Sequence, residues 1–363
     1  MILHLSHSTG SIDGGIASAV AGLVQAQRTA SCAACWLPGA EHPAWRRDAQ
    51  LRSRVVREQP DLVHIHGLWR SPTRIAAGLN RAGVPLLIAP HGMLDPWAMA
   101  HSRRRKAVIW RLWERRALED ASCLQALCPA EMRAIRSLGL SAPVALIPNG
   151  VALPDQDAPL PPAPWVDRVP SGDRVLLFLG RFHAKKGLDP LLEAWRHMSR
   201  EAVSSGWWLA LVGYGDRGRL ERRLELDPIP RGLLLDPCFG ERKLAALATA
   251  SAFVLPSFSE GLPVAALEAM SWGLPCLLSA ACNLPEAFTA GAALQAEPEP
   301  RALEEALRRL FQLGDADLAV MGGAGRRLVA DQFTWPRIAA QCAELYRWIL
   351  GGGSPPSCVN GAT

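Results

Sequence analysis

The chain has 363 residues, of which 49% are hydrophobic and 20% charged, and a formal net charge of +5 at pH 7. These are the values of a folded globular protein, and they exclude a largely disordered or collagen-like chain. The N-terminal residues preceding Asp13 contain no Lys or Arg, and the longest charge-free stretches are interrupted by Pro and polar residues. The sequence therefore predicts neither a secretory leader nor a membrane-spanning helix.

The chain contains nine cysteines, an odd number scattered through apolar runs. This usage favours reduced thiols in a cytoplasmic protein over a disulfide framework. Cys32 and Cys35 have the spacing of a redox pair, but they fall inside an apolar strand candidate, so we expect buried thiols there.

Charge is shared unevenly between the two halves of the chain. Residues 1–150 carry 18 Lys and Arg against 10 Asp and Glu, a net charge of +8, whereas residues 151–363 carry 21 against 24, a net charge of −3. The asymmetry indicates that the N-terminal half meets an anionic partner. No recognised nucleic-acid-binding module is present, so nucleic acid is not the partner we expect.

Short apolar runs alternate with helical patterns along the chain, and runs without strict alternation suit strands buried on both faces of a parallel sheet. The predicted strands are 1–6, 32–37, 61–66, 84–89, 123–127, 174–179, 208–212, 233–235, 252–256 and 275–278. The predicted helices include 15–27, 45–58, 73–81, 104–118, 188–198, 219–226, 241–249, 263–270 and 336–350. This alternation predicts an α/β fold of two doubly wound domains.

The Pro-rich stretch that follows the turn at 148–150 is the natural boundary between the two domains. We predict an N-terminal domain over 1–155, a linker over 156–172 and a C-terminal domain over 173–335. A helix over 336–350 and a flexible Gly-, Ser- and Pro-rich tail over 351–363 follow. Clefts between such domains commonly bind ligands.

The first loop, from His7 to Ile16, follows a predicted strand and opens a predicted helix. Gly14 and Gly15 would let backbone amides approach an anion at the helix N-terminus. The loop lacks the three spaced glycines of the dinucleotide fingerprint. A phosphate site and a plain tight turn therefore both stay open.

Metal binding has weak support in the sequence. His64 and His66 lie on one face of a predicted strand, which suits zinc, but no third ligand is evident nearby. The triplets 155–157 and 315–317 have the form Asp-x-Asp, yet neither follows a buried strand, so neither makes a good metal–diphosphate clamp. We expect no metal.

Two features of the N-terminal half could meet a ligand or a surface. His91 stands before Gly92 at the end of a predicted strand, where it is either structural or a donor or base that faces a cleft. Residues 97–116 form a basic amphipathic stretch that includes Trp97, Trp110 and Trp113. Such a helix is either an ordinary one with a solvated face or one that lies on an anionic membrane surface, and we favour peripheral membrane contact.

The second half opens with a basic loop after its first predicted strand. Arg181 can fork onto phosphate oxygens, and Lys186 can add a point charge before Gly187 and a helix. Because ligands bind at the carboxyl ends of parallel strands, the position favours an anion site over a solvated loop.

Glu260 and Glu268 lie eight positions apart where a later strand passes into a helix. Glu260 falls in the loop, and Glu268 falls about two turns further along the chain. The two acids either cap and solvate a helix or bind the hydroxyls of a ligand, and the βα junction favours the ligand.

The order and spacing of these motifs resemble those of the retaining GT-B glycosyltransferases of family 4 over residues 1–350. The segments that carry the resemblance are Gly14-Gly15, Pro90-His91-Gly92, Pro148-Asn149-Gly150-Val151, Gly180-Arg181…Lys186-Gly187, Val212-Gly213-Tyr214-Gly215 and Glu260…Glu268. The resemblance implies two Rossmann-like domains that face a cleft. The domain over 1–155 would bind the acceptor, the domain over 173–335 the nucleotide sugar, and the helix over 336–350 would pack toward the N-terminal domain.

The resemblance also implies roles for single residues. Arg181 and Lys186 would neutralise the leaving diphosphate, and Glu268 would bind the ribose hydroxyls. Glu260 would orient the donor sugar and assist the oxocarbenium-like state, and His91 would contact the transferred sugar.

The donor site would be completed by the backbone and side chains of Gly14, Gly15, Gly213, Gly261 and Leu262. The loop Gly-Leu-Pro after the first acid is shorter than in many family members, but the interval to the second acid is unchanged. No side chain is an evident covalent nucleophile, which fits a front-face mechanism. The family implies no cofactor and no metal, with a UDP- or GDP-sugar as the donor substrate.

The sequence thus predicts a retaining glycosyltransferase that moves a sugar from a nucleotide diphosphate sugar to an acceptor hydroxyl. We expect it to act in surface or exopolysaccharide biosynthesis on a lipid-linked glycan, in the cytoplasm at the inner face of the cell membrane. A sugar-nucleotide 2-epimerase on the same fold and a non-catalytic GT-B partner protein stay open as alternatives.

Overall fold

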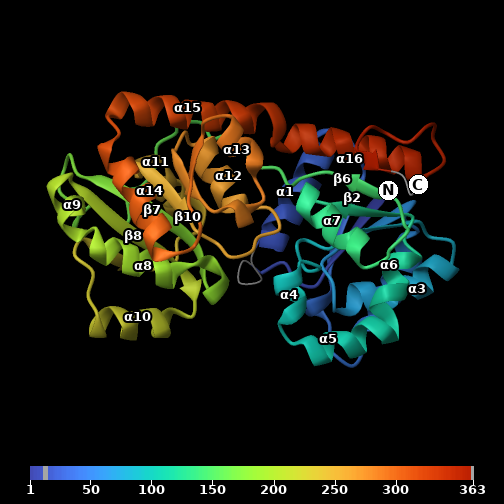
Figure 1. The fold of residues 1–363 in the computed structure, drawn as a ribbon. Helices are drawn as coiled ribbons and strands as arrows, with labels where there is room; N and C mark the ends of the chain where they lie inside the picture. The colour runs from blue at the N-terminus through green and yellow to red at the C-terminus, as the bar shows by residue number, and fades with distance from the viewer. Residues whose placement is uncertain (11–14, 361–363) are drawn as a thin grey trace. The chain divides into compact units, whose positions relative to one another are not determined.

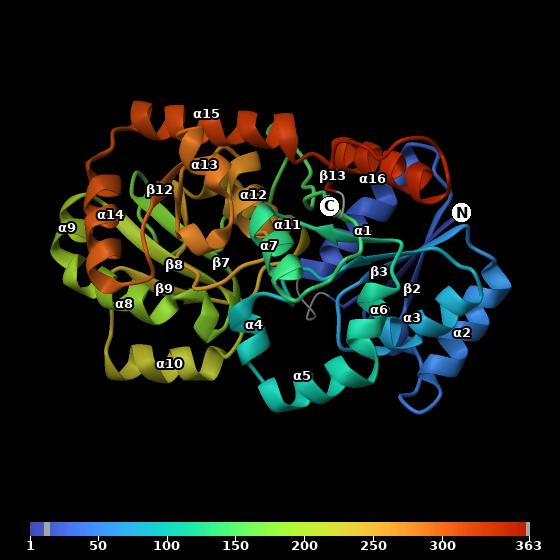
Figure 2. The same cartoon turned by 45° about the vertical axis from the view of Figure 1, so that its right-hand side comes forward.

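The computed structural model describes residues 1–10 and 15–360. The chain divides into two compact units (Figures 1 and 2), of which unit 1 comprises Met1–Gly150 with Phe333–Thr363, and unit 2 comprises Val151–Gln332. Each unit is built on one largely parallel sheet, so the predicted fold class of two doubly wound α/β domains is confirmed.

Unit 1 contains a seven-stranded sheet in the order β13-β6-β5-β4-β3-β1-β2. Its strands are β1 (Ile2–Ser6), β2 (Ala34–Pro38), β3 (Leu62–His66), β4 (Leu86–Ala89), β5 (Cys123–Ala126), β6 (Val144–Leu146) and β13 (Val359–Asn360). The chain runs from β1 outward to β2 and then returns to β3 on the other side of β1, so strand order reverses between β1 and β3. The carboxyl ends of these two strands form the switch point at which such sheets bind ligands.

The helices of unit 1 are α1 (Gly15–Thr29), α2 (Arg47–Glu58), α3 (Ser71–Arg81), α4 (Pro96–Ala100), α5 (Arg103–Ile109), α6 (Arg115–Glu119), α7 (Pro129–Ser137) and α16 (Trp335–Ile349). α16 lies against α1 although more than 300 residues separate them in sequence (Figure 2). The close approach depends on glycine, since a Cβ at Gly22 or Gly150 would lie 2.3 or 2.7 Å from the Trp335 ring.

Unit 2 contains a six-stranded parallel sheet in the order β12-β11-β10-β7-β8-β9. Its strands are β7 (Arg174–Phe182), β8 (Trp207–Gly215), β9 (Gly232–Leu235), β10 (Ala252–Leu255), β11 (Cys276–Leu278) and β12 (Ala293–Gln295). Its helices are α8 (Leu188–His197), α9 (Ser199–Ser204), α10 (Arg217–Leu226), α11 (Gly240–Thr249), α12 (Val264–Ser271), α13 (Pro285–Thr289), α14 (Pro300–Gln312) and α15 (Asp315–Gln332). Numbered within the unit, the strand order is that of Rossmann-like sheets, and it reverses between β7 and β10.

The predicted helix over 104–118 is confirmed, but its middle does not have the α-helical period. A π-helical segment, Trp110–Glu114, separates α5 from α6, and the Arg115 N–H donates to the carbonyl of Trp110. The Glu114 side chain is buried and accepts hydrogen bonds from the Trp69 N–H at 3.0 Å and the Thr73 hydroxyl at 3.1 Å. Turning this side chain inward accounts for the local change of helical period.

Two further expectations need correction. Val359–Asn360 pair antiparallel with β6, so part of the predicted flexible tail is a strand. Cys32 precedes β2, and both Cys32 and Cys35 are half-buried rather than fully buried. All nine cysteines are free thiols, as their number suggests. Among the described residues, no helix is long and apolar enough to cross a membrane.

Candidate active site

The predicted acidic and basic residues of unit 2 meet at the switch point of its sheet. Arg181 lies near the end of β7, and Lys186 lies in the short 3₁₀ helix Ala184–Lys186 that follows. Glu260 lies in the loop after β10, the strand next to β7 in the sheet. The two loops therefore leave neighbouring strands at the edge where ligands of such sheets bind.

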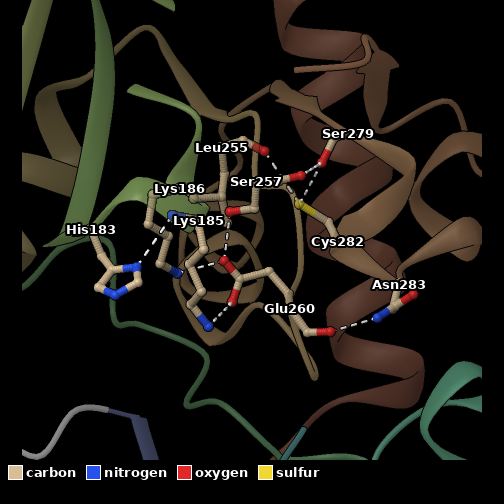
Figure 3. Close-up of polar contacts among 9 residues, drawn as sticks. All are labelled: His183, Lys185, Lys186, Leu255, Ser257, Glu260, Ser279, Cys282 and Asn283. Carbon is tan, nitrogen blue, oxygen red and sulfur yellow. Dashed lines mark hydrogen bonds and ion pairs between the residues drawn. The ribbon is translucent and has the colours of Figure 1, made fainter. Parts of the chain in front are cut away.

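Glu260 and Lys186 are in direct contact (Figure 3). The Lys186 Nζ donates to Glu260 Oε1 at 2.6 Å, and the Ser257 hydroxyl donates to the same oxygen at 2.6 Å. The Lys185 Nζ lies 3.8 Å from Glu260 Oε2. One carboxylate thus binds two ammonium groups and a hydroxyl.

The Glu260 side chain is almost entirely buried, with 7% of the residue exposed. Burial by itself would raise the pKa of this carboxyl, but the charges of Lys186 and Lys185 and the hydrogen bonds from Lys186 and Ser257 outweigh it, so that the pKa is lowered. Glu260 is therefore ionised at neutral pH, as a carboxylate with charged donors around it should be.

The backbone holds the two loops together at close range. Gly187 has φ of +67°, and a Cβ there would lie 1.8 Å from the carbonyl oxygen of Pro256, so only glycine fits. The Phe258 N–H donates to the carbonyl of Lys185 at 2.7 Å. The Asn283 side chain donates to the carbonyl of Glu260 at 2.6 Å (Figure 3). The loop geometry therefore fixes the position of the ion pair.

Arg181 and Gly213 lie on the adjacent strands β7 and β8. The Arg181 side chain is exposed, whereas Gly213 is packed so closely that a Cβ would lie 1.9 Å from the carbonyl oxygen of Gly180. The structure brings Arg181 to the same strand end as Lys186 but shows it facing solvent.

Glu268 lies on α12 and has a different partner from Glu260. Its Oε1 accepts a hydrogen bond from the Lys243 Nζ of α11 at 2.7 Å, and about a quarter of each side chain is exposed. Gly261 and Leu262 connect the two acids, with Leu262 buried and Gly261 half-buried. The two carboxylates are therefore separate ion pairs, not one shared carboxylate pair.

His91 occupies a strained turn at the end of β4. Its φ is +55° and that of Gly92 is +74°, and the left-handed region is unfavourable for a non-glycine residue. The buried Glu131 carboxylate holds this turn, since it accepts from the Gly92 N–H at 2.5 Å and the Leu127 N–H at 2.8 Å. Burial raises the pKa of Glu131 to about 7.

The structure brings His91 into contact with His66, one of the two histidines that the sequence suggests as zinc ligands, and His66 in turn contacts His64 and a fourth histidine, His4. His66 hydrogen-bonds to His91 at 3.0 Å and to His4 at 2.9 Å, and the His64 ring lies 4.0 Å from the His66 ring. His4 supplies the third imidazole that sequence spacing does not reveal, because it comes from β1. The three buried rings of His4, His64 and His66 have nitrogens within 4.8 Å of one another.

The remaining predictions fall in other places. Gly15 begins α1, and Gly14 lies outside the described residues. Asp155 and Asp157 are in the segment after β6, and Asp315 begins α15, so neither triplet lies at the ends of β7 and β10. A hollow in unit 2 contains none of the predicted site residues and is lined by Phe182, His183, Ala184, Leu188, Asp189, Asp216, Arg219, Leu220 and Arg223.

Four contributors to the site were not predicted: Lys185, Ser257, Asn283 and Lys243. Lys185 lies inside the motif from Gly180 to Gly187, and Ser257 lies three positions before Glu260, so both could have been proposed from their place beside predicted site residues. Asn283 follows the short 3₁₀ helix Ala280–Cys282, and Lys243 lies on α11. Nothing in their local sequence marks these two residues.

Comparison with known proteins identifies the family and the fold of this chain. The family model described as "Glycosyl transferases group 1" matches residues 173–313, and the "Glycosyl transferase 4-like domain" model matches residues 14–150. Both units match the fold of solved GT-B enzymes. Sucrose-phosphate synthase from Thermosynechococcus elongatus gives a TM-score of 0.82 at 21% identity, covering 97% of this chain and 99% of that one. Anabaena Alr3699/HepE in complex with UDP-glucose gives 0.73 at 17% identity, covering 94% and 98%.

The chain belongs to the group 1 glycosyltransferases, which confirms the resemblance read from the motifs. A D-inositol 3-phosphate glycosyltransferase of Thermobispora bispora is 29% identical over 307 residues, which are 80% of this chain and 71% of that protein. The amylovoran biosynthesis glycosyltransferase AmsK of Erwinia amylovora is 29% identical over 311 residues, 82% of this chain and 66% of that protein.

The buried imidazoles should make unit 1 sensitive to acid. Burial lowers the pKa of His4 and His91 to about 4 and that of His64 and His66 well below the usual 6.5, with Arg28 adding to the effect at His4. Between pH 6.5 and 4 the unfolded chain therefore binds more protons than the native chain, and stability is lost as the pH falls through that window.

We expect His4→Gln to flatten the dependence of the unfolding free energy on pH in this window by about 1.4 kcal/mol per pH unit, the value for one proton. Urea unfolding measured from pH 4 to 7 checks this, with the exposed His101→Gln as control. Burial raises the pKa of Glu131 and Glu114 to about 7, so these two carboxyls stabilise the folded state as the pH falls. Both variants retain them, so they do not affect the difference between the two slopes. Equal slopes in the two variants would contradict the account.

Proposed function

We propose that this glycosyltransferase transfers a sugar from a nucleotide diphosphate sugar to an acceptor hydroxyl with retention of the anomeric configuration. The observation that carries the proposal is the Lys186–Glu260 contact at the switch point of unit 2. It places fixed positive and negative charges side by side at the sheet edge where a nucleotide sugar would bind. The Anabaena protein, which has the same fold and was solved in complex with UDP-glucose, supports a donor of this class.

The basic side chains are suited to the leaving group. Departure of a nucleoside diphosphate leaves negative charge on the phosphate oxygens. Lys186 and Lys185 lie in one loop, and Arg181 lies exposed at the preceding strand end. Preorganised cations at the position where charge develops lower the barrier without reorganising during the step. They supply at this position the positive charge that other enzymes obtain from a metal, so we propose that the reaction needs none.

Glu260 is better placed to orient and stabilise than to attack. Its Oε1 already accepts from Lys186 and Ser257, and its other oxygen faces Lys185. A carboxylate held in this way is a weak nucleophile, yet its negative charge favours an oxocarbenium-like sugar nearby. We therefore propose that the departing phosphate, not a protein side chain, deprotonates the acceptor on the same face of the sugar.

Glu268 has the geometry of an anchor for hydroxyls. Its carboxylate is partly exposed and fixed on a helix, and Lys243 holds one oxygen. Ionised carboxylates form strong hydrogen bonds to hydroxyl donors, so we propose that Glu268 binds the ribose. Gly213, Gly261 and Leu262 would shape the donor site beside it, and Gly14 and Gly15 would offer amides to the diphosphate.

Our proposal for the acceptor rests on the charge of the N-terminal half and on the names of similar proteins. We propose a lipid-linked glycan and a role in surface or exopolysaccharide biosynthesis. The name of AmsK, an amylovoran biosynthesis glycosyltransferase, supports a polysaccharide pathway. The basic N-terminal half, with a net charge of +8 over residues 1–150, supports an anionic partner.

The proposal is tested by incubating the protein with UDP-, GDP- and ADP-sugars and a membrane extract that contains lipid-linked acceptors. Release of nucleoside diphosphate and a product whose anomeric configuration by NMR matches the donor would support it. Inversion of the configuration, or conversion of the donor sugar without any acceptor, would contradict it.

Conservative replacement of the two acids should separate their roles. Glu260→Gln should lower kcat about 100-fold with little change in KM for the donor, as for a lost electrostatic contact to a transition state. Glu268→Gln should instead raise KM about tenfold, since it weakens one charge-assisted hydrogen bond. Steady-state kinetics with the preferred donor measures both, with the exposed Glu241→Gln as control. Identical kinetic defects in the two variants would show that the assigned roles are wrong.

We also propose peripheral membrane contact through the segment 97–116. The exposed face of this segment combines Arg103, Arg104 and Arg105 with exposed apolar side chains, of which Val108 and Leu112 are 57% and 69% exposed. Trp110 and Trp113 do not belong to this face, since Trp110 packs on the unit 1 core. Basic side chains beside exposed apolar ones suit an anionic lipid surface.

Replacing Arg103, Arg104 and Arg105 together by Gln should weaken binding to vesicles of phosphatidylglycerol and phosphatidylcholine by roughly 100-fold, at about 1 kcal/mol for each Arg. Cosedimentation at physiological salt measures this. The matched control replaces three exposed arginines elsewhere in unit 1, Arg46, Arg52 and Arg57. Equal losses in both triple variants, or no binding by the unaltered protein, would exclude a membrane role for this segment.

A further inference from the structure

One continuous chain of hydrogen bonds crosses the core of unit 1 and ends at His91. It begins with the contacts of His66 to His91 and to His4 described above. The other nitrogen of His4, Nε2, lies 2.8 Å from Gln27 Oε1 on α1. Each of these imidazoles therefore uses a ring nitrogen to meet the next member of the chain.

The chain continues from Gln27 to the last helix of the unit. The Gln27 Nε2 donates to the Tyr346 hydroxyl on α16 at 2.9 Å, and that hydroxyl lies 3.0 Å from His64 Nδ1. Gln27 and Tyr346 are separated by 319 positions in sequence. All of these side chains except His91 are buried.

The orientation of the Gln27 amide sets the direction of this chain, because its Nε2 donates to Tyr346 and its Oε1 faces His4 Nε2. The Gln125 side chain also has a fixed orientation. The Gln125 Nε2 on β5 donates to the carbonyl of Ile147 at 2.9 Å. A carbonyl can only accept, so the amide orientation of Gln125 is fixed and its Oε1 is an acceptor. Within the described residues, Gln125 Oε1 and His64 Nε2 are both buried, and neither atom has a hydrogen-bond partner. Burial lowers the pKa of His64, and the nearby Gln125 side chain opposes this effect.

The protons can then be placed one at a time. The unpaired buried acceptor of Gln125 favours a proton on His64 Nε2, because an unpaired buried polar group costs about 1–3 kcal/mol. A neutral His64 then accepts at Nδ1, so Tyr346 donates its hydroxyl proton there and accepts from Gln27. Gln27 Oε1 consequently accepts from His4 Nε2–H.

The ring protons of His4, His66 and His91 can be placed in the same way. With its proton on Nε2, His4 accepts at Nδ1 from His66 Nε2–H. His66 then accepts at Nδ1 from His91 Nε2–H. His91 is left with a bare lone pair on Nδ1, and no described residue donates to that atom. The links from Tyr346 to His91 share one direction, which the Gln27 amide sets, so reversing one of them would reverse the others.

We propose that Tyr346 and Gln27 act as positioning residues that hold His91 as the neutral Nε2–H tautomer, so that His91 Nδ1 accepts a hydrogen bond from a hydroxyl of the substrate. The tautomer follows from the hydrogen bonds alone, and only the identification of the hydroxyl with one of the transferred sugar depends on the proposed function. The strained backbone of His91 and Gly92 keeps the ring in place. His91 is then specific for a group that can donate.

Metal binding at His4, His64 and His66 competes with this assignment. A zinc ion needs a lone pair from each imidazole. The His4 and His66 nitrogens that face each other already share a proton at 2.9 Å, and the His64 Nδ1 lone pair accepts from Tyr346. The hydrogen bonds therefore account for the cluster without a metal ion.

The tautomers can be measured directly by NMR on the full chain labelled with ¹⁵N-histidine. Long-range ¹H–¹⁵N correlation at neutral pH distinguishes protonated from bare ring nitrogens, and comparison with His91→Gln assigns the His91 signals. We expect a bare Nδ1 and a protonated Nε2 for His91, unchanged by one equivalent of Zn²⁺. A protonated Nδ1, or a zinc-dependent shift of the His4, His64 or His66 signals, would overturn the proposal.

Tyr346→Phe tests the long-range control, because it removes the hydroxyl that links His64 to Gln27. The Gln27 amide is then free to flip, and the His91 signals should move to positions averaged between the two tautomers. Tyr214→Phe, which changes the other tyrosine of the chain and lies in unit 2, should leave them unchanged. His91 signals identical in both variants would show that Tyr346 does not set the tautomer. None of these spectra depends on glycosyl transfer, so failure of the tautomer assignment and failure of the proposed function are distinguishable.

Discussion

The ion pair between Lys186 and Glu260 is the interaction on which the candidate site depends. A buried carboxylate is costly unless charged donors surround it, and Glu260 has Lys186, Lys185 and Ser257 within reach. These partners come from loops that follow two adjacent strands, so the pair forms only when the sheet has its observed order. Gly187 makes the approach possible, since a side chain there would collide with the backbone after β10. Fold and site chemistry are therefore linked at one point.

The physical constraint in unit 1 is a different one, because several imidazoles are buried in its core. His4, His64 and His66 lie in an apolar core and are neutral because burial lowers the pKa of each. A neutral imidazole has one donor and one acceptor. Gln27 meets His4 and Tyr346 meets His64 Nδ1, whereas His64 Nε2 has no hydrogen-bond partner among the described residues. Hydrogen bonds that all run in one direction thus connect β1, β3, α1 and α16. Through Tyr346, α16 belongs to this buried network.

The sequence was sufficient for the local parts of this account and insufficient for the distant ones. Lys186 and Glu260 could be placed at strand ends because apolar runs mark the strands and the loops follow directly. Lys243 could not be paired with Glu268, since no local pattern tells which face of α11 meets α12. The contact between Gln27 and Tyr346 spans 319 positions, and only the packing of α16 on α1 creates it. Local periodicity predicts elements and their ends, whereas side-chain partners on separate elements require the tertiary structure.

The most direct test of the central claim is calorimetry of nucleotide binding, with each nucleoside diphosphate compared with its monophosphate for the uridine, guanosine and adenosine series. If Lys186 and its neighbours bind the leaving diphosphate, the protein should bind one diphosphate at least about tenfold more tightly than its monophosphate, which corresponds to about 1.4 kcal/mol. Lys186→Gln should abolish this preference and leave monophosphate binding nearly unchanged. An equal preference in the variant, or no diphosphate binding by the unaltered protein, would contradict the account.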